Sequence, residues 1–156
     1  MAIDLVVERA TRAPGLPDDA TIARWVEAAL AGTRPEAALG LRIVDEGEGA
    51  ALNARYRGRE GPTNVLSFPS ELPPGLGIDL LGDLVLCAPV VAAEAMAQGK
   101  APGDHWAHLV VHGVLHLLGY DHQHEEEAER METREREVLA RLGVGDPYEP
   151  APGSPC

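Results

Sequence analysis

The chain has 156 residues, of which 45% are hydrophobic, and its formal net charge is −12 at pH 7. These values fit one globular domain with a single core, and they argue against a protein that coats nucleic acid through a broad basic surface. The longest apolar runs are far shorter than the roughly 20 residues that cross a bilayer, and the first residues show no signal-peptide pattern.

Hydrophobic periodicity and turn signals predict nine elements along the chain. We expect strands over residues 3–8, 39–44, 64–68 and 82–87. We expect helices from 18–21 to about 31, over 48–56, from 89 to about 98, from 104 to about 118, and from 125 to about 142. Pro89 suits a first helical position, and Asp104 is expected to cap the helix that follows it.

The order βαβαββααα predicts an α+β fold, with one mixed four-stranded sheet packed with about five helices. Residues 1–145 are expected to form a single domain, because no repeat or boundary interrupts the pattern. Residues 146–156, which contain four prolines, are expected to be a disordered tail. Neither Cys87 nor Cys156 is placed as a disulfide framework would require, which favours a reducing, cytoplasmic location.

The stretch from residue 112 to residue 122 reads His-Gly-Val-Leu-His-Leu-Leu-Gly-Tyr-Asp-His. His112 and His116 share one face of the predicted helix, and Gly119 stands where a left-handed cap would end it. The turn then delivers His122. Three imidazoles with an open fourth position are typical of a catalytic zinc site. We therefore expect a metal-dependent, hydrolase-like domain that binds one Zn2+ per chain through His112, His116 and His122.

This spacing matches the metzincin protease pattern His-Glu-x-x-His-x-x-Gly-x-x-His, with one departure. Gly113 stands where the proteases carry the glutamate that acts as general base. The ligand spacing is kept while the proteolytic base is missing. A metalloprotease is therefore an alternative that lacks an evident base.

Other polar residues near this motif each allow a functional and a structural interpretation. His105 and His108 fall on the same helical face as His112, so they either line a groove leading to the metal or are surface or capping histidines. Asp121 either orients an imidazole or takes a proton from water, or it is only a turn residue. Arg57, with Arg55 and Arg59, fits either phosphate recognition or a solvated basic face.

Four blocks of the sequence stand out together, and they are Tyr56–Pro69, Leu81–Asp83, His105–His108 and His112–His122. In this order they resemble the YbeY family of bacterial rRNA maturation factors, and the resemblance runs from about Leu52 to Tyr148. It implies a cytoplasmic, zinc-dependent, single-strand-specific endoribonuclease that acts in small-subunit rRNA processing, ribosome maturation and ribosome quality control. It also implies three histidine ligands, which map to His112, His116 and His122, and an important arginine, which maps to Arg57.

With this resemblance we expect Arg57 and Asp121 to act in catalysis, and Arg57, Arg59 and His108 to contact the substrate. The expected partners are single-stranded RNA or rRNA, small-subunit ribosomal proteins and ribosome-associated assembly factors, with no membrane or DNA. Attack by water and attack by the ribose 2′-OH both stay open. A non-catalytic assembly factor that contains zinc is the second alternative.

Overall fold

The computed structural model describes residues 2–31, 36–70, 80–120 and 124–145, so the predicted tail of residues 146–156 lies outside the described residues. Within these ranges the predicted order of elements is confirmed. The strands and helices are β1 (Ala2–Ala10), α1 (Asp19–Leu30), β2 (Glu36–Val44), α2 (Glu46–Arg57), β3 (Val65–Pro69), β4 (Leu80–Cys87), α3 (Ala88–Ala97), α4 (Pro102–Leu117) and α5 (Glu125–Arg141).

Two helix starts show how local chemistry sets the boundaries. The Asp18 side chain accepts a hydrogen bond from the Thr21 backbone N–H at 2.8 Å and caps α1, so it is the first of the candidate start positions 18–21 that begins this helix. The prediction that Asp104 caps α4 is wrong. The helix begins at Pro102, because proline suits a first helical position, and the N-cap residue is Ala101. Asp104 lies in the first turn, where its charge faces the positive end of the helix dipole.

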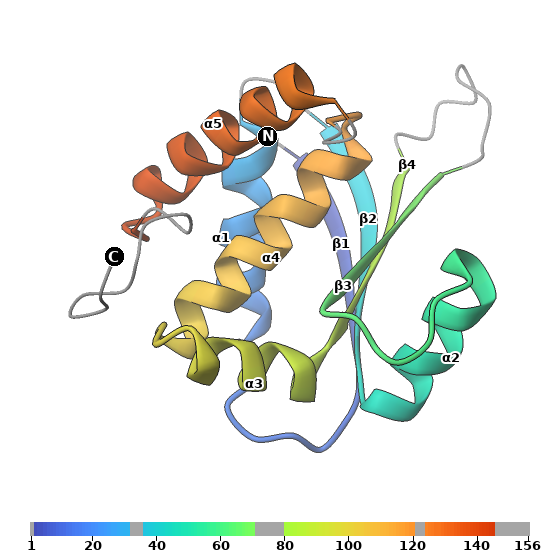
Figure 1. Cartoon of the computed structure of the whole chain (residues 1–156). Coiled ribbons are helices and arrows are strands. Elements are labelled where there is room, and N and C mark those ends of the chain that lie inside the picture. Colours follow the sequence, from blue (N-terminus) through green and yellow to red (C-terminus); the bar gives the residue numbers. More distant parts are fainter. Residues whose placement is uncertain (1, 32–35, 71–79, 121–123, 146–156) are drawn as a thin grey trace.

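The sheet is mixed, and its strand order is β1-β2-β4-β3. β2 runs parallel to β1 and to β4, and β3 pairs antiparallel with β4 at the edge. Figure 1 shows α1, α4 and α5 on one side of the sheet and α2 on the other. This confirms the expected α+β class with one mixed sheet.

The helix α4 is the centre of the core. Val111, Val114 and Leu115 have no measurable exposure, and they pack among the buried side chains of α1 and the sheet. Gly113 allows the helix to lie close to the sheet, since a Cβ atom there would stand 2.7 Å from Leu84 Cδ2. Among the residues that the structure describes, no helix is long and apolar enough to span a membrane.

Candidate metal centre on the histidine helix

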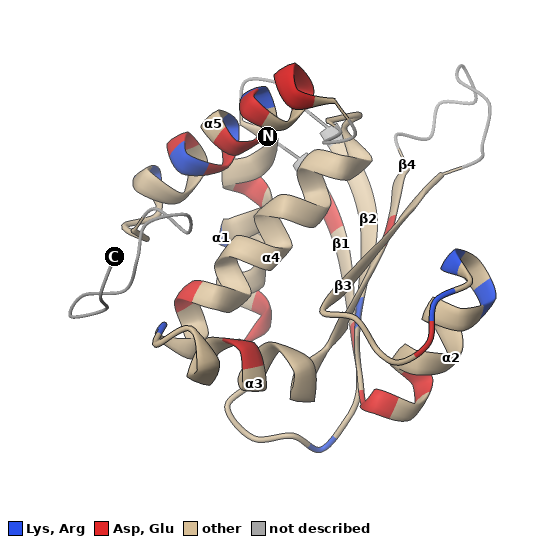
Figure 2. Ribbon diagram, viewed as in Figure 1, with Lys and Arg blue, Asp and Glu red and all other residues tan. Residues whose placement is uncertain are grey.

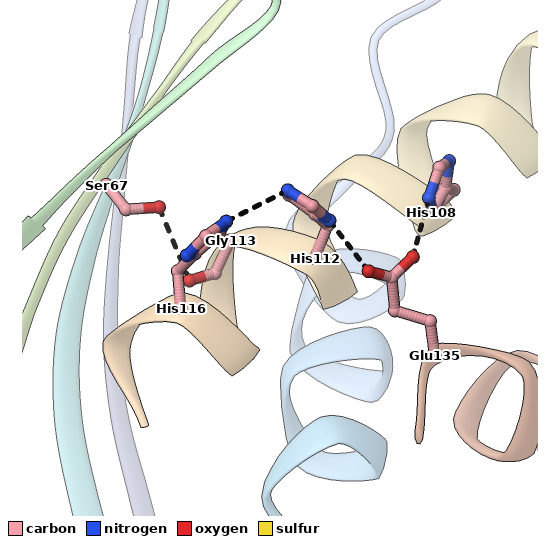
Figure 3. A network of polar contacts seen from close by, with 6 residues as sticks. All are labelled: Ser67, His108, His112, Gly113, His116 and Glu135. Carbon is pink, nitrogen blue, oxygen red and sulfur yellow. Dashed lines mark hydrogen bonds and ion pairs between the residues drawn. The ribbon is translucent and has the colours of Figure 1, made fainter. Parts of the chain in front are cut away.

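Four histidines form a row along one face of α4, at steps of three and four residues. Their ring centroids are separated by 6.2 Å between His105 and His108, 6.0 Å between His108 and His112, and 4.6 Å between His112 and His116. The row ends near the C-terminus of the helix, and Figure 3 shows its last three members with the residues they contact. The predicted alignment of His112 and His116 on one helical face is therefore confirmed.

The two imidazoles of His112 and His116 face each other through their Nε2 atoms, which lie 3.1 Å apart. Ligand nitrogens on one tetrahedral zinc ion, with bonds of about 2.0–2.1 Å, are separated by about 3.3 Å. The observed distance is close to this value. The two nitrogens form a hydrogen bond here, and at this separation they could share an ion once both are deprotonated.

The His112 ring is held by Glu135 of α5, which contacts the ring nitrogen that does not face His116. His112 Nδ1–H donates to Glu135 Oε1 at 2.7 Å, and His108 Nε2–H donates to Glu135 Oε2 at 2.8 Å (Figure 3). Burial raises the pKa of the Glu135 carboxyl, but the hydrogen bonds that it accepts from both histidines lower this pKa by more, to about 2. Glu135 is therefore a carboxylate at neutral pH and accepts both hydrogen bonds.

His108, His112 and Glu135 also form a group that could itself hold a metal ion, since one ligand atom from each lies within 4.8 Å of the others. The separations of 2.7 and 2.8 Å between the rings and the carboxylate are hydrogen-bond lengths. In the described arrangement Glu135 therefore supports His112, and the Nε2 atom of His112 is left facing His116.

Sequence reasoning missed Glu135, which it placed only within the predicted helix from 125 to about 142. Its position carried a signal. Glu135 falls on the apolar stripe of α5, in phase with Met131, Val138 and Leu142, so its side chain had to enter the core. A buried carboxylate requires hydrogen-bond donors, and the histidine row was the available source.

Gly113, the position of the protease base in the metzincin pattern, points away from the site. A Cβ atom there would lie 2.7 Å from Leu84 Cδ2 and 3.4 Å from Val65 Cγ2. Its carbonyl accepts a hydrogen bond from Ser67 Oγ at 3.4 Å (Figure 3). A glutamate at this position would enter the packed interface between α4 and the sheet. The structure therefore has no space at position 113 for the glutamate base that a metalloprotease would need.

The helix ends as predicted, with Gly119 in a left-handed conformation at a φ of 104°. Gly119 N–H donates to His116 O at 3.0 Å, and Tyr120 N–H donates to Leu115 O at 3.0 Å, which is the Schellman pattern. The chain thus turns sharply one turn after His116. Asp121 and His122 lie outside the described residues, so their roles stay predictions.

His105 belongs to a second, separate network. It is 3% exposed, and its Nε2 atom lies 3.0 Å from Glu94 Oε1, an oxygen that also accepts from Asn64 Nδ2 at 3.0 Å. Burial lowers the pKa of the His105 ring, while the hydrogen bond that the ring donates to Glu94 opposes this shift. His105 therefore ties α4 to α3 and to the start of β3, and it does not line an open groove.

The predicted phosphate-binding arginines lie at the far end of α2. Arg57 is the last residue of that helix, Gly58 caps it in a left-handed conformation, and Asn53 Nδ2 donates to Gly61 O at 2.8 Å to fold the following loop back. Figure 2 shows the cations gathered at this end. The structure does not bring Arg57 or Arg59 next to the histidines, because α2 lies on the opposite side of the sheet (Figure 1).

The sheet face beside α2 is hollowed into a groove of about 1100 Å³. Tyr56 and Phe68 meet edge to face there, with ring centroids 5.1 Å apart. The arginine that lines the groove, Arg42, forms ion pairs with Glu8 at 2.7 Å and Glu48 at 2.6 Å. Its charge is therefore neutralised within the protein, which leaves Arg57 and Arg59 as the better candidates for phosphate.

Comparison with known proteins links this arrangement to one family. The family model described as "Endoribonuclease YbeY" matches residues 13–143. A protein of Alkalilimnicola ehrlichii named "Endoribonuclease YbeY" is 63% identical over 153 residues, which cover 94% of this chain and 92% of that protein. A protein of the same name from Xanthomonas axonopodis pv. citri is 57% identical over 150 residues, covering 94% and 93%.

A solved structure shares the fold. The solution structure of TM1509 from Thermotoga maritima superposes with a TM-score of 0.57 at 22% sequence identity, and the match covers 97% of this chain and 99% of that one. At this level of identity the likeness concerns the arrangement of the helices and the sheet. It agrees with the α+β architecture of Figure 1.

Proposed function

The chain belongs to the Endoribonuclease YbeY family of RNA-cleaving hydrolases, and from this premise we propose that it is a zinc-dependent, single-strand-specific endoribonuclease. We place its action in the cytoplasm, in small-subunit rRNA processing, ribosome maturation and ribosome quality control. Its partners in this proposal are single-stranded rRNA, small-subunit ribosomal proteins and ribosome-associated assembly factors. The observation that carries the metal centre is the 3.1 Å approach of the His112 and His116 Nε2 atoms in front of a buried carboxylate.

In this proposal His112 and His116 bind one zinc ion through Nε2, and His122 supplies the third nitrogen. The Schellman turn at Gly119 supports this, because it reverses the chain three residues before His122. When bound there, zinc would supply the Lewis acidity that phosphodiester cleavage uses. Asp121 is proposed to hold or accept a proton beside the site.

Arg57 and Arg59 are proposed to bind phosphates of the RNA, since a planar guanidinium pairs with two phosphate oxygens at once. Their place across the sheet from the histidine row favours contact with the RNA backbone beyond the scissile bond. His108 was predicted to contact substrate. Its bond to Glu135 engages the Nε2 atom, so a substrate contact would have to use another part of the ring.

Metal analysis coupled to RNA cleavage tests the proposal. Purified protein should contain one zinc per chain and cut a single-stranded RNA, and His112→Ala should lose both properties. His124→Ala is the matched control, because His124 is exposed at the start of α5 and should retain both. Undiminished cleavage by His112→Ala would show that a contaminating nuclease was being measured. Product ends carrying a 2′,3′-cyclic phosphate would rule out direct attack by water.

A second experiment separates the enzyme from a non-catalytic assembly factor. Arg57→Ala should keep the melting temperature yet weaken rRNA processing, mainly by raising KM for RNA. Arg55→Ala is the control, because Arg55 lies over the Tyr56 ring at 5.4 Å on the same exposed helix end. If Arg57→Ala lowers kcat with KM unchanged, Arg57 acts on the reacting atoms. If processing survives intact, the proposed role of Arg57 is wrong.

A further inference from the structure

Glu135 is a carboxylate placed where the fold calls for an apolar residue. Its neighbours on the inner face of α5 are Met131, Val138 and Leu139, and its own exposure is 0%. Burying a charge in such a place costs stability unless it is hydrogen-bonded. The hydrogen bonds that compensate the buried Glu135 carboxylate therefore indicate its role.

Both carboxylate oxygens are used, and each contacts a different histidine of α4. Oε1 accepts from His112 Nδ1 at 2.7 Å, and Oε2 accepts from His108 Nε2 at 2.8 Å. A carboxylate can only accept hydrogen bonds, so each contacting nitrogen carries a proton. In the neutral His112 ring, a proton on Nδ1 leaves the lone pair on Nε2, the atom that lies 3.1 Å from His116.

We propose that Glu135 is a positioning residue that holds His112 in the Nδ1–H tautomer, with Nε2 presented to the metal, and that His108 anchors this carboxylate through its second oxygen. The inference rests on the proposed metal centre and extends it from α4 to α5. Neither Glu135 nor His108 binds the metal in this arrangement. A carboxylate behind a ligating imidazole raises the basicity of the ring and fixes its orientation.

The measurement that does not depend on a variant is nitrogen NMR of histidine side chains in the zinc-loaded wild-type protein. The expected result is a protonated Nδ1 and a zinc-bound Nε2 for His112, and an uncoordinated ring for His108. Zinc bound to His112 Nδ1 or to the His108 ring would overturn the proposal. It would instead support a site built from His108, His112 and Glu135.

Zinc affinity measured by competition with a chelator gives the second test. In Glu135→Gln the side chain has a single, uncharged acceptor oxygen, so it cannot accept hydrogen bonds from both histidines. This variant should bind zinc about 10–100-fold more weakly, while one zinc still binds at saturation. Glu135→Asp retains the charge but retracts it by one methylene, so it should fall between Glu135→Gln and wild type. Glu129→Gln, an exposed change on the same helix, should leave the affinity unchanged. Affinity of Glu135→Gln within twofold of wild type would overturn the role of Glu135.

These readouts distinguish failure of this inference from failure of the proposed function. If the wild-type protein binds zinc as described but cleaves no RNA, the endoribonuclease proposal fails and the role of Glu135 stands. If the protein cleaves RNA with zinc and Glu135→Gln binds zinc normally, only the role of Glu135 fails. Absence of zinc binding by the wild-type protein would overturn both.

Discussion

Replacement of Gly113 by alanine should destabilise the protein, although alanine favours helices. The added Cβ would stand 2.7 Å from Leu84 Cδ2, 3.2 Å from Leu84 Cδ1 and 3.4 Å from Val65 Cγ2. Leu84 has 0% exposure, so its side chain has no solvent to move into. Overpacking of this kind costs about 1–3 kcal/mol, and the gain in helix propensity returns about 1 kcal/mol. The expected net loss is about 0–2 kcal/mol.

Gly103→Ala is the matched control, since Gly103 lies in the first turn of the same helix with nothing within 4 Å of its would-be Cβ. It should be neutral or stabilising by up to about 1 kcal/mol. The difference between the two variants isolates the overpacking cost of about 1–3 kcal/mol. Urea unfolding followed by circular dichroism measures it, with EDTA present so that bound metal contributes nothing to the free energy of unfolding.

A double-mutant cycle with Leu84→Ala then tests the contact itself. In that background Gly113→Ala should lose most of its penalty, because the two methyl groups closest to the added Cβ, both of Leu84, are gone. The packing argument is refuted if Gly113→Ala stabilises the protein as much as Gly103→Ala does. It is also refuted if Leu84→Ala leaves the effect of Gly113→Ala unchanged.

Three further predictions concern titration, thiol access and metal removal. Burial lowers the pKa of His105 below its ordinary value of 6.5. The unfolded chain therefore binds the proton more readily than the folded protein does. The free energy of unfolding should then fall as the pH drops from about 7 to 5.5, and more steeply in wild type than in His105→Gln. Equal slopes in urea titrations at each pH would contradict this. Burial also raises the pKa of the Cys87 thiol. In Cys156→Ser, where Cys87 is the remaining thiol, it should react with a disulfide reagent only after denaturation. Fast reaction of the native Cys156→Ser protein would contradict this prediction. EDTA should stop RNA cleavage and lower the melting temperature, and added zinc should restore both; at zinc 100-fold above Kd the lost stabilisation is about 2.7 kcal/mol. Cleavage that persists in EDTA would show that the reaction does not require a metal ion.

The residues that sequence reasoning placed correctly are those whose signal is local. The apolar periodicity around His112 and His116 defined their helix, and Gly119 marked its left-handed end. Asp104 was misjudged because Pro102, two residues earlier, suits the first helical position and decides the start.

What could not be read from the sequence depends on which elements pack together. Glu135 meets His112 only because α5 docks on α4, a contact across 23 residues of chain. The separation of Arg57 from the histidine row follows from the strand order β1-β2-β4-β3 and from α2 lying on the other side of the sheet. No local pattern encodes either arrangement.

The dependence of His112 on α5 has a consequence for how the protein matures during synthesis. All four histidines of α4 leave the ribosome before Glu135 does, so α4 can form before the carboxylate that contacts His108 and His112 has been synthesised. A chain that stops short of Glu135, or whose α5 has not docked, would carry His112 and His116 but leave the His112 ring free to take either tautomer. Under the proposed metal centre, tight metal binding would then signal that α5 is in place, since the carboxylate that orients His112 belongs to that helix.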